Sequence, residues 1–179
     1  MTTENIKDVE SLVLGSNQKM IGTHSGVFHC DEVLALSILK YSNDFKDGLI
    51  VRSRSDAIHE KMNILVDVGS VFDPENYRFD HHQRSFEEYF DTEITKDVKM
   101  SSAGLIFKYF GREIVDNAIK AWDVEPVSDD EWPKIRRDIY KKLFLEVDAI
   151  DNGVSQLKAG TGGELIYTIG TGLGSRVSR

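Results

Sequence analysis

The chain has 179 residues, a length that suits one domain with a substantial hydrophobic core. Its formal net charge of −8 argues against a broad basic surface for gripping nucleic-acid backbones, although metal ions held by carboxylates can still attract an anionic substrate. A single cysteine excludes an internal disulfide framework, and the apolar runs are far too short for a membrane span, so we expect no membrane partner.

Predicted strands and helices alternate along the chain. Apolar runs that end in polar residues or glycine predict strands at residues 19–24, 48–54, 63–68 and 77–82. Capping residues and apolar faces predict helices at residues 31–41, 55–62, 103–110, 113–122 and 129–151. We expect a surface loop at 84–99 and a glycine-rich tail from 155. The alternation predicts an α/β fold, with a mainly parallel sheet flanked by helices.

The sequence also predicts how the chain divides. Residues 1–18 are expected to form a flexible or helical extension, and residues 19–179 to form the folded domain. In a parallel sheet, ligands collect at the carboxyl ends of the strands. The side chains that follow each predicted strand are therefore the first place to look for a functional site.

Histidines and aspartates lie at these strand ends. Asp80, His81 and His82 close the fourth predicted strand, and the alternation of a strand places Asp80 and His82 on one face and His81 on the other. Because parallel strands end at one edge, separate segments are expected to meet there. The candidate metal ligands at these ends and at the end of the last helix are His24, His29, Asp31, Asp67, His81, Asp148 and Asp151.

Mixed imidazole and carboxylate ligands suit manganese, iron, zinc or magnesium, and a bridging carboxylate is what two neighbouring ions require. Two such ions stabilise the attacking and leaving oxygens of a phosphoryl displacement and lower the pKa of a bound water. The pattern predicts hydrolysis of a phosphoester or phosphoanhydride. Each residue taken singly also fits an ordinary structural role. We interpret Cys30 as a small buried residue and His59 as a residue of a surface helix, neither of them a ligand.

Five segments resemble the Myg exonuclease family, the melanocyte proliferating gene product and its relatives: residues 21–32, 66–69, 77–84, 101–104 and 147–153. That family is similar to the DHH phosphoesterases, which include RecJ-type nucleases and manganese-dependent pyrophosphatases. The resemblance implies a DHH-like domain and a metal-dependent 3′–5′ exonuclease on RNA that uses metal-activated water. It also implies two Mn²⁺ ions as cofactor, with Mg²⁺ or Zn²⁺ as alternatives.

The resemblance further implies individual roles. One ion would be held by His24, His29 and Asp67. The other would be held by Asp31, His81 and a late aspartate, with Asp67 bridging. His82 would face the scissile phosphate, aided by Arg84. The late aspartate stays open between Asp151, which lies closer to the DHH pattern, and Asp148, one turn earlier on the same helix face.

Alternative functions remain open at this point. Family members are about twice as long, so a second domain is expected to be missing here, and with it a source of basic residues. The competing functions are a pyrophosphatase-like small-molecule phosphohydrolase and a truncated, non-catalytic metal-binding domain. The substrate partner is RNA or another nucleotide phosphoester, and the oligomeric state stays unassigned. The first twenty residues contain no targeting signal, which indicates the cytoplasm or nucleus, whereas the resemblance adds the mitochondrion.

Overall fold

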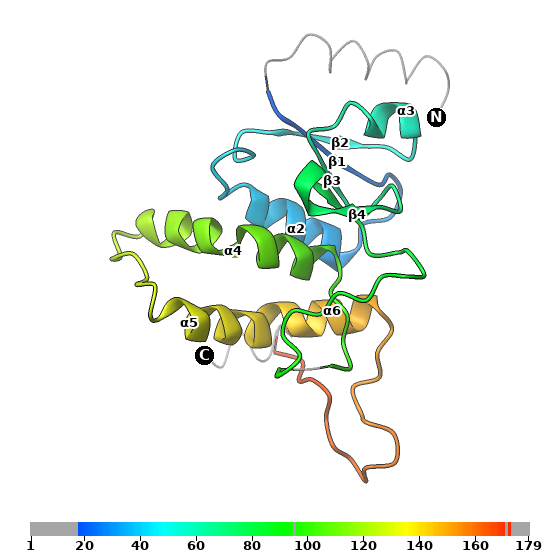
Figure 1. Cartoon of the computed structure of the whole chain (residues 1–179), viewed down its shortest axis with the longest axis vertical. Helices are drawn as coiled ribbons and strands as arrows, with labels where there is room; N and C mark the ends of the chain where they lie inside the picture. The colour runs from blue at the N-terminus through cyan, green and yellow to red at the C-terminus, as the bar shows by residue number, and fades with distance from the viewer. Residues whose placement is uncertain (1–17, 95, 171, 173–179) are drawn as a thin grey trace.

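The computed structural model describes residues 18–94, 96–170 and 172 (Figure 1). The extension predicted at 1–18 lies outside the described residues except for its last residue, as does most of the tail after 170. One five-stranded sheet has the spatial order β2-β1-β3-β5-β4. All neighbouring strands are parallel except the antiparallel pair β4 and β5. The strands are β1 (Met20–Thr23), β2 (Leu49–Arg52), β3 (Ile64–Val66), β4 (Phe72–Asp73) and β5 (Arg78–Phe79).

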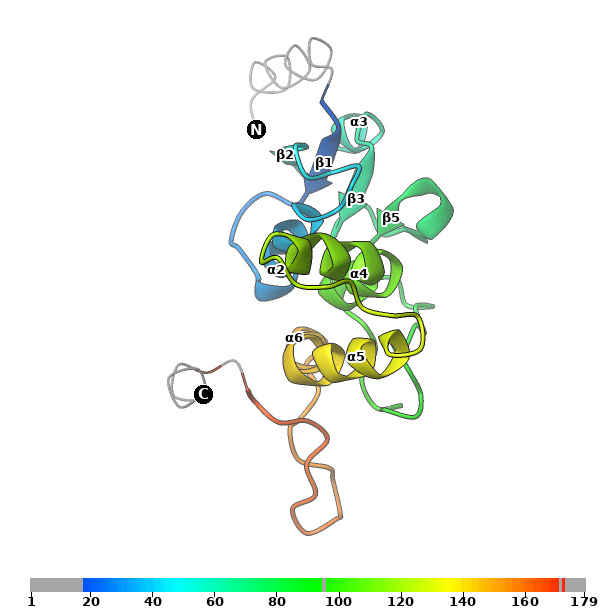
Figure 2. The same cartoon turned by 90° about the vertical axis from the view of Figure 1, so that its left-hand side faces the viewer.

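Four of the helices, α2, α4, α5 and α6, form two further layers on one side of this sheet, and α3 lies on the other. Helices α2 and α4 lie side by side against the strands. The continuous segment α5–η2–α6 packs on the side of these two helices that faces away from the sheet (Figures 1 and 2). A mainly parallel sheet flanked by helices confirms the predicted α/β class. The bounds are α2 (Cys30–Leu39), α3 (Asp56–His59), 3-10 turn η1 (Pro74–Asn76), α4 (Ser102–Lys120), α5 (Trp132–Ile139), π-helical turn η2 (Tyr140–Phe144) and α6 (Leu145–Asp151).

Alternating side chains divide the core between the two faces of the sheet. Ile21 and Ile64 enter the large core shared with α2, α4 and α6. Met20 and Leu65 face the other way, into a small core with Ile58 of α3. Both faces are therefore apolar, which is why the strands read as continuous hydrophobic runs. Among the described residues, no helix combines the length and apolar character needed to cross a bilayer.

Several predicted elements differ from the structure. The helices predicted at 103–110 and 113–122 are one helix, α4, because Gly111 lies inside it against the ring of Phe107. The loop at 84–99 contains no helix or strand among its described residues, but it is not confined to the surface, since Phe86, Phe90 and Val98 are buried. Burial of these apolar side chains fixes the segment against the core although it forms no regular secondary structure.

The order of the strands creates a natural site. Strand β1 has β2 on one side and β3 on the other. The connection after β1 therefore leads to one edge of the sheet, and the connection after β3 leads to the other. At such a switch point the connections after the two strands diverge, which leaves room at their carboxyl ends for a ligand. The segments that follow β1 and β3 begin at His24 and Asp67.

Candidate metal centre

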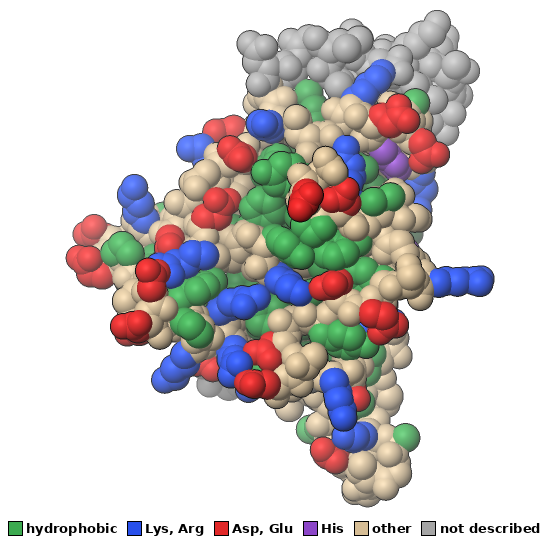
Figure 3. Space-filling view, viewed as in Figure 1, with side chains coloured by type: hydrophobic (Ala, Val, Ile, Leu, Met, Phe, Trp, Pro, Cys, Tyr) green, Lys and Arg blue, Asp and Glu red, His purple; other side chains and the backbone are tan. Residues whose placement is uncertain are grey.

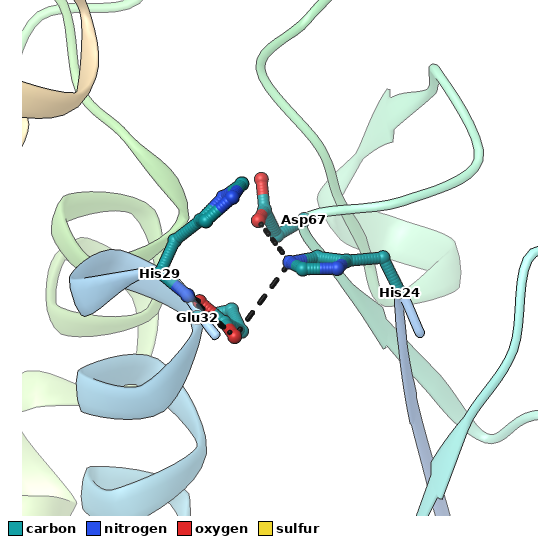
Figure 4. A group of neighbouring side chains, drawn as sticks. All are labelled: His24, His29, Glu32 and Asp67. Carbon is teal, nitrogen blue, oxygen red and sulfur yellow. Dashed lines mark hydrogen bonds and ion pairs between the residues drawn. The ribbon is translucent and has the colours of Figure 1, made fainter. Parts of the chain in front are cut away.

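Side chains from five parts of the fold meet at the carboxyl edge of the sheet, the fifth being the end of α6 with Asp151. His24 follows β1, Asp67 follows β3, and the paired histidines follow β5. The first turn of α2 contributes more, and Figure 4 shows His29 and Glu32 of that turn facing His24 and Asp67. His24 and Asp67 are almost completely buried. The predicted convergence of these strand ends is therefore present in the structure.

Asp67 lies at the middle of the cluster. Its Oδ2 is 3.3 Å from Nε2 of His24, and its Oδ1 is 3.4 Å from Nε2 of His81. The residue has a φ of 59°, in the left-handed region that aspartate tolerates better than most residues. Its N–H still bonds to the Phe79 carbonyl at 3.1 Å, so the chain turns sharply directly after the ladder ends. This turn holds the carboxylate between two imidazoles.

The first ligand group contains His24, His29, Glu32 and Asp67, whose ligand atoms all lie within 4.8 Å of one another. Nε2 of His24 is 3.6 Å from Oε1 of Glu32. Nδ1 of His24 lies 3.3 Å from the Ser25 carbonyl, and a bond from Nδ1–H to that oxygen leaves Nε2 free as a metal ligand.

Glu32 was not predicted as a site residue. Its carboxylate accepts the His29 backbone N–H at 2.9 and 2.7 Å, which is half of a capping box at the start of α2. In the sequence, Glu32 follows His29 by three residues, which is the spacing of a capping box. That spacing predicts the cap, but it does not predict that the capping carboxylate is fully buried and faces His24.

The second part of the cluster surrounds His81. Asp67, His81 and His82 form one group of close ligand atoms, and His29, Asp31 and Asp151 form another. Nε2 of His81 lies 3.1 Å from Oδ2 of Asp151 and 3.9 Å from Oδ2 of Asp31. Among the predicted ligands, the structure thus brings together all but Asp148.

Buried atoms without hydrogen-bond partners test whether these residues suit a metal. Nε2 of His24, both oxygens of Asp31, Oδ1 of Asp67 and Nε2 of His81 are buried and accept or donate no hydrogen bond. Leaving such atoms unpaired costs free energy, so native structures seldom contain several together. Imidazole nitrogen and carboxylate oxygen are ligands that divalent transition metals and magnesium accept. The donor set therefore fits a divalent cation.

Charge crowding supports the same conclusion. Burial, together with the charges of Asp67 and Asp151, raises the pKa of Asp31 to about 8. Burial lowers the pKa of His81, but the neighbouring carboxylates of Asp151 and Asp67 outweigh that effect and raise the pKa to about 10. The cluster therefore retains protons because its carboxylates repel one another. A bound cation would relieve that repulsion.

Asp148 has a different place in the structure. Its Oδ1 accepts the Ser101 N–H at 3.0 Å, the Ser101 hydroxyl at 2.7 Å and the Gly104 N–H at 3.1 Å. Its Oδ2 accepts the Tyr140 hydroxyl at 2.7 Å. The carboxylate thus caps the N-terminus of α4, where the free N–H groups favour a negative charge. The structure brings Asp151 to the cluster and leaves Asp148 in the core.

His82 borders a cavity of about 200 Å³ whose walls also include His24, His29, Arg54 and Asp67. Nδ1 of His82 lies 2.6 Å from Oδ1 of Asp80, and 56% of the His82 side chain is exposed. The hydrogen bond to Asp80 raises the pKa of His82. Burial raises the pKa of Asp80, but bonds from His82 and Ser70 outweigh it and lower the pKa overall.

Two arginines differ in their relation to this cavity. Arg84, the predicted partner of His82, is exposed in the following turn and does not line the cavity. Arg54, which was not predicted, lines it: its Nε donates to the Ser25 carbonyl at 3.1 Å, and its Nη2 is 3.3 Å from Nδ1 of His24. Its position at the end of the second predicted strand was the signal that could have revealed it.

Cys30 and His59 correct two interpretations. Cys30 is exposed, because it is the first residue of α2 and its side chain points away from the core. His59 is buried rather than on the surface, with Nε2 3.0 Å from the Ser53 carbonyl. Helix α3 packs against the face of the sheet that carries Met20 and Leu65. The short polar segment does not predict that contact. Neither residue belongs to a group of candidate metal ligands.

Comparison with known proteins agrees with these features. The model MYG1_exonuc, described as "Uncharacterised protein family (UPF0160)", matches residues 20–179. A MYG1 protein of Caenorhabditis elegans is 42% identical over 76% of this chain and 40% of its own length. The human MYG1 exonuclease is 38% identical over 89% of this chain and 41% of its own length. A MYG1 protein of Saccharomyces cerevisiae is 43% identical over 77% of this chain and 39% of its own length.

The chain spans about 40% of the length of these curated relatives. No solved structure matches it, so the predicted relation to the DHH phosphoesterases stays a prediction. The family model covers nearly all of the sheet, the metal-ligand cluster and the cap of α4. The chain therefore belongs to the MYG1 exonuclease family.

Proposed function

We propose that this chain forms the metal-binding part of a phosphodiesterase that removes nucleotides from the 3′ end of RNA, with two Mn²⁺ ions as its cofactor and Mg²⁺ or Zn²⁺ as alternatives. The observation that carries this proposal is the position of Asp67, whose two oxygens face His24 and His81 separately. A carboxylate placed in this way suits a bridging ligand. The word exonuclease in the names of the mammalian relatives supports the reaction class.

The ligands would divide around Asp67. His24, His29 and Glu32 would hold one ion, and Asp31, His81 and Asp151 would hold the other. Two neighbouring divalent ions supply an activated water and stabilise the charge on the attacking and leaving oxygens. Asp148 is outside this set because both its carboxylate oxygens are occupied, Oδ1 by the cap of α4 and Oδ2 by the Tyr140 hydroxyl.

Residues of the chain itself would position the phosphate. Asp80 accepts a hydrogen bond from Nδ1–H of His82, so Nε2 of His82 can exchange a proton or donate a hydrogen bond to a phosphate oxygen. Arg54 adds a fixed positive charge on the wall of the same cavity. The guanidinium geometry suits phosphate oxygens. Arg84 stays a sequence-based candidate for a contact beyond this cavity.

The test combines metal content with cleavage of an RNA oligomer labelled at its 5′ end, in Mn²⁺ and in a chelator. The wild-type chain should bind metal and shorten the RNA one nucleotide at a time. Asp67→Ala should lose both properties. Asp138→Ala is the matched control, because Asp138 is exposed on α5 and lies outside every candidate ligand group. Absence of metal from the wild type would refute the site.

Hydrolysis of pyrophosphate is the second candidate function. The net charge of −8 favours a small substrate, and Figure 3 shows Lys and Arg side chains interspersed with acidic ones on the face that it draws. Pyrophosphate offered to the same preparation separates the two functions. Hydrolysis of pyrophosphate with intact RNA would support this alternative. Bound metal without turnover of either substrate would support a non-catalytic metal-binding domain.

A further inference from the structure

We propose that an apolar pocket beside the metal centre binds a nucleobase of the substrate, with the ring of Phe28 as its stacking surface. The inference deepens the proposed function and rests on it. The pocket has a volume of about 570 Å³ and lies between α2 and the η2–α6 segment. Its apolar walls are formed by Phe28, Val33, Leu34, Leu143 and Val147.

Phe28 is unusual for a large aromatic residue because 64% of its surface is exposed. The guanidinium carbon of Arg52 lies 3.7 Å from the centre of one face of the ring. Arg52 is itself held in place, since Nη1 donates to the Gly26 carbonyl at 3.2 Å and Nη2 lies 3.8 Å from Glu32. The ring is thus supported from one side by a cation. Because most of its surface is exposed and it lines the pocket, the ring is accessible to a planar ligand.

His29 connects the pocket with the metal centre. It lines both the apolar pocket and the cavity that contains His24, Asp67 and His82. Phe28 directly precedes it in the loop between β1 and α2. In a nucleotide the base and the phosphate are separated only by the ribose. A phosphate held in the cavity would therefore place its neighbouring base within reach of this pocket.

The chemistry of the pocket favours a base over an aliphatic ligand. Bases stack on aromatic side chains without strong sequence preference, because every base has a π-face. Ser37 and Cys30 also line the pocket, and the Ser37 hydroxyl oxygen, whose proton is donated to the Val33 carbonyl, can still accept a hydrogen bond from the polar edge of a base. The binding of a base by stacking does not need a basic surface, which agrees with the net charge of −8.

Cys30 provides a direct test, because it is the only cysteine of the chain and lines the pocket. The rate of its alkylation by iodoacetamide would be measured by mass spectrometry in a chelator, with adenosine, uridine or ribose added. Both nucleosides should slow the alkylation and ribose should not. In Phe28→Ala, half-maximal protection should require about tenfold more nucleoside, as expected when a base loses a stacking partner.

Two variants serve as controls. Phe28→Trp should keep the protection, because an aromatic face remains. Val27→Ala should also keep it, since Val27 is 78% exposed in the same loop and does not line the pocket. Protection by ribose equal to that by nucleosides would overturn the inference, and so would full protection in Phe28→Ala.

The experiment separates this inference from the proposed function. Protection of Cys30 needs neither metal nor catalysis, so it can persist in a chain that fails to cleave RNA. Conversely, a chain that shortens RNA but shows no protection by adenosine or uridine would keep the proposed function and lose the nucleobase pocket.

Discussion

Substitution of Asp148 and of Asp151 should have opposite effects, although the two residues lie one helical turn apart. Asp148→Ala removes the acceptor of four hydrogen bonds, from Ser101, Gly104 and Tyr140. Each buried donor left unpaired costs about 1–3 kcal/mol. A loss of about 4 kcal/mol or more is therefore expected, a large part of the usual stability of a domain. Metal binding should survive in the fraction that folds.

Asp151→Ala should leave the stability of the metal-free protein within about 1 kcal/mol, since its side chain is partly exposed and relief of the repulsion with Asp31 offsets the loss of its contact with His81. Its affinity for Mn²⁺ should fall at least about tenfold, as expected for loss of a charged ligand. Urea unfolding in a chelator, followed by circular dichroism, measures the stability. Calorimetric titration with Mn²⁺ measures the affinity.

Asn variants keep the comparison informative if Asp148→Ala fails to fold. Asp148→Asn retains one acceptor oxygen, so it should cost only about 1–2 kcal/mol and leave Mn²⁺ affinity unchanged. Asp151→Asn should show the reverse pattern. The reasoning would be refuted if Asp148→Asn lost Mn²⁺ binding at unchanged stability, or if Asp151→Asn destabilised the metal-free protein more than Asp148→Asn.

The remaining predictions concern the cap and the cavity. Gly104→Ala should destabilise the chain by about 1–3 kcal/mol in urea unfolding, because its methyl group would overlap the Asp148 carboxylate; an unchanged midpoint would contradict this. Burial raises the pKa of Asp148 to about 7 despite its hydrogen bonds. Between about pH 4 and pH 7 the folded state therefore holds a proton that the unfolded state releases, so stability in a chelator should fall over this range by up to about 1.4 kcal/mol per pH unit. Asp148→Asn should remove this pH dependence. Arg54→Ala should reduce RNA cleavage about 10- to 100-fold at unchanged metal content, in line with loss of a charged hydrogen bond, and an equal loss in Arg84→Ala would favour the sequence-based assignment instead. His82→Gln should lower the rate at saturating RNA about 100-fold and leave Mn²⁺ affinity within about threefold, and loss of the metal would contradict its assignment to the phosphate.

Much of the candidate site could be predicted because it depends on local pattern and one rule of topology. Apolar runs predict the strands, and parallel strands must end at one edge of the sheet. Histidines and aspartates directly after those runs, such as His24, Asp67 and His81, are therefore expected to meet. The structure places both histidines within ion-pair distance of Asp67. Strand order was not needed for that prediction, only strand direction.

Other members of the site depend on contacts between distant segments. Whether Asp148 or Asp151 reaches the histidines is decided by how α6 packs against α4, where Tyr140 of the π-helical turn donates a hydrogen bond to Asp148. The sequence signal of Glu32 predicts only a helix cap, and that of Arg54 predicts only a place near a strand end, so neither predicts a side chain in the cavity. Their roles follow from the packing of α2 on the sheet and from the position of β2 beside β1.

The sequence by itself therefore determined the class of the fold and the chemical character of the site, because both follow from residue types at strand ends. The tertiary structure alone decided which acidic residues face the histidines, which arginine lines the cavity, and that Phe28 remains exposed beside His29. Those features depend on distances between segments that are far apart in the chain. Periodicity within a segment carries no information about such distances.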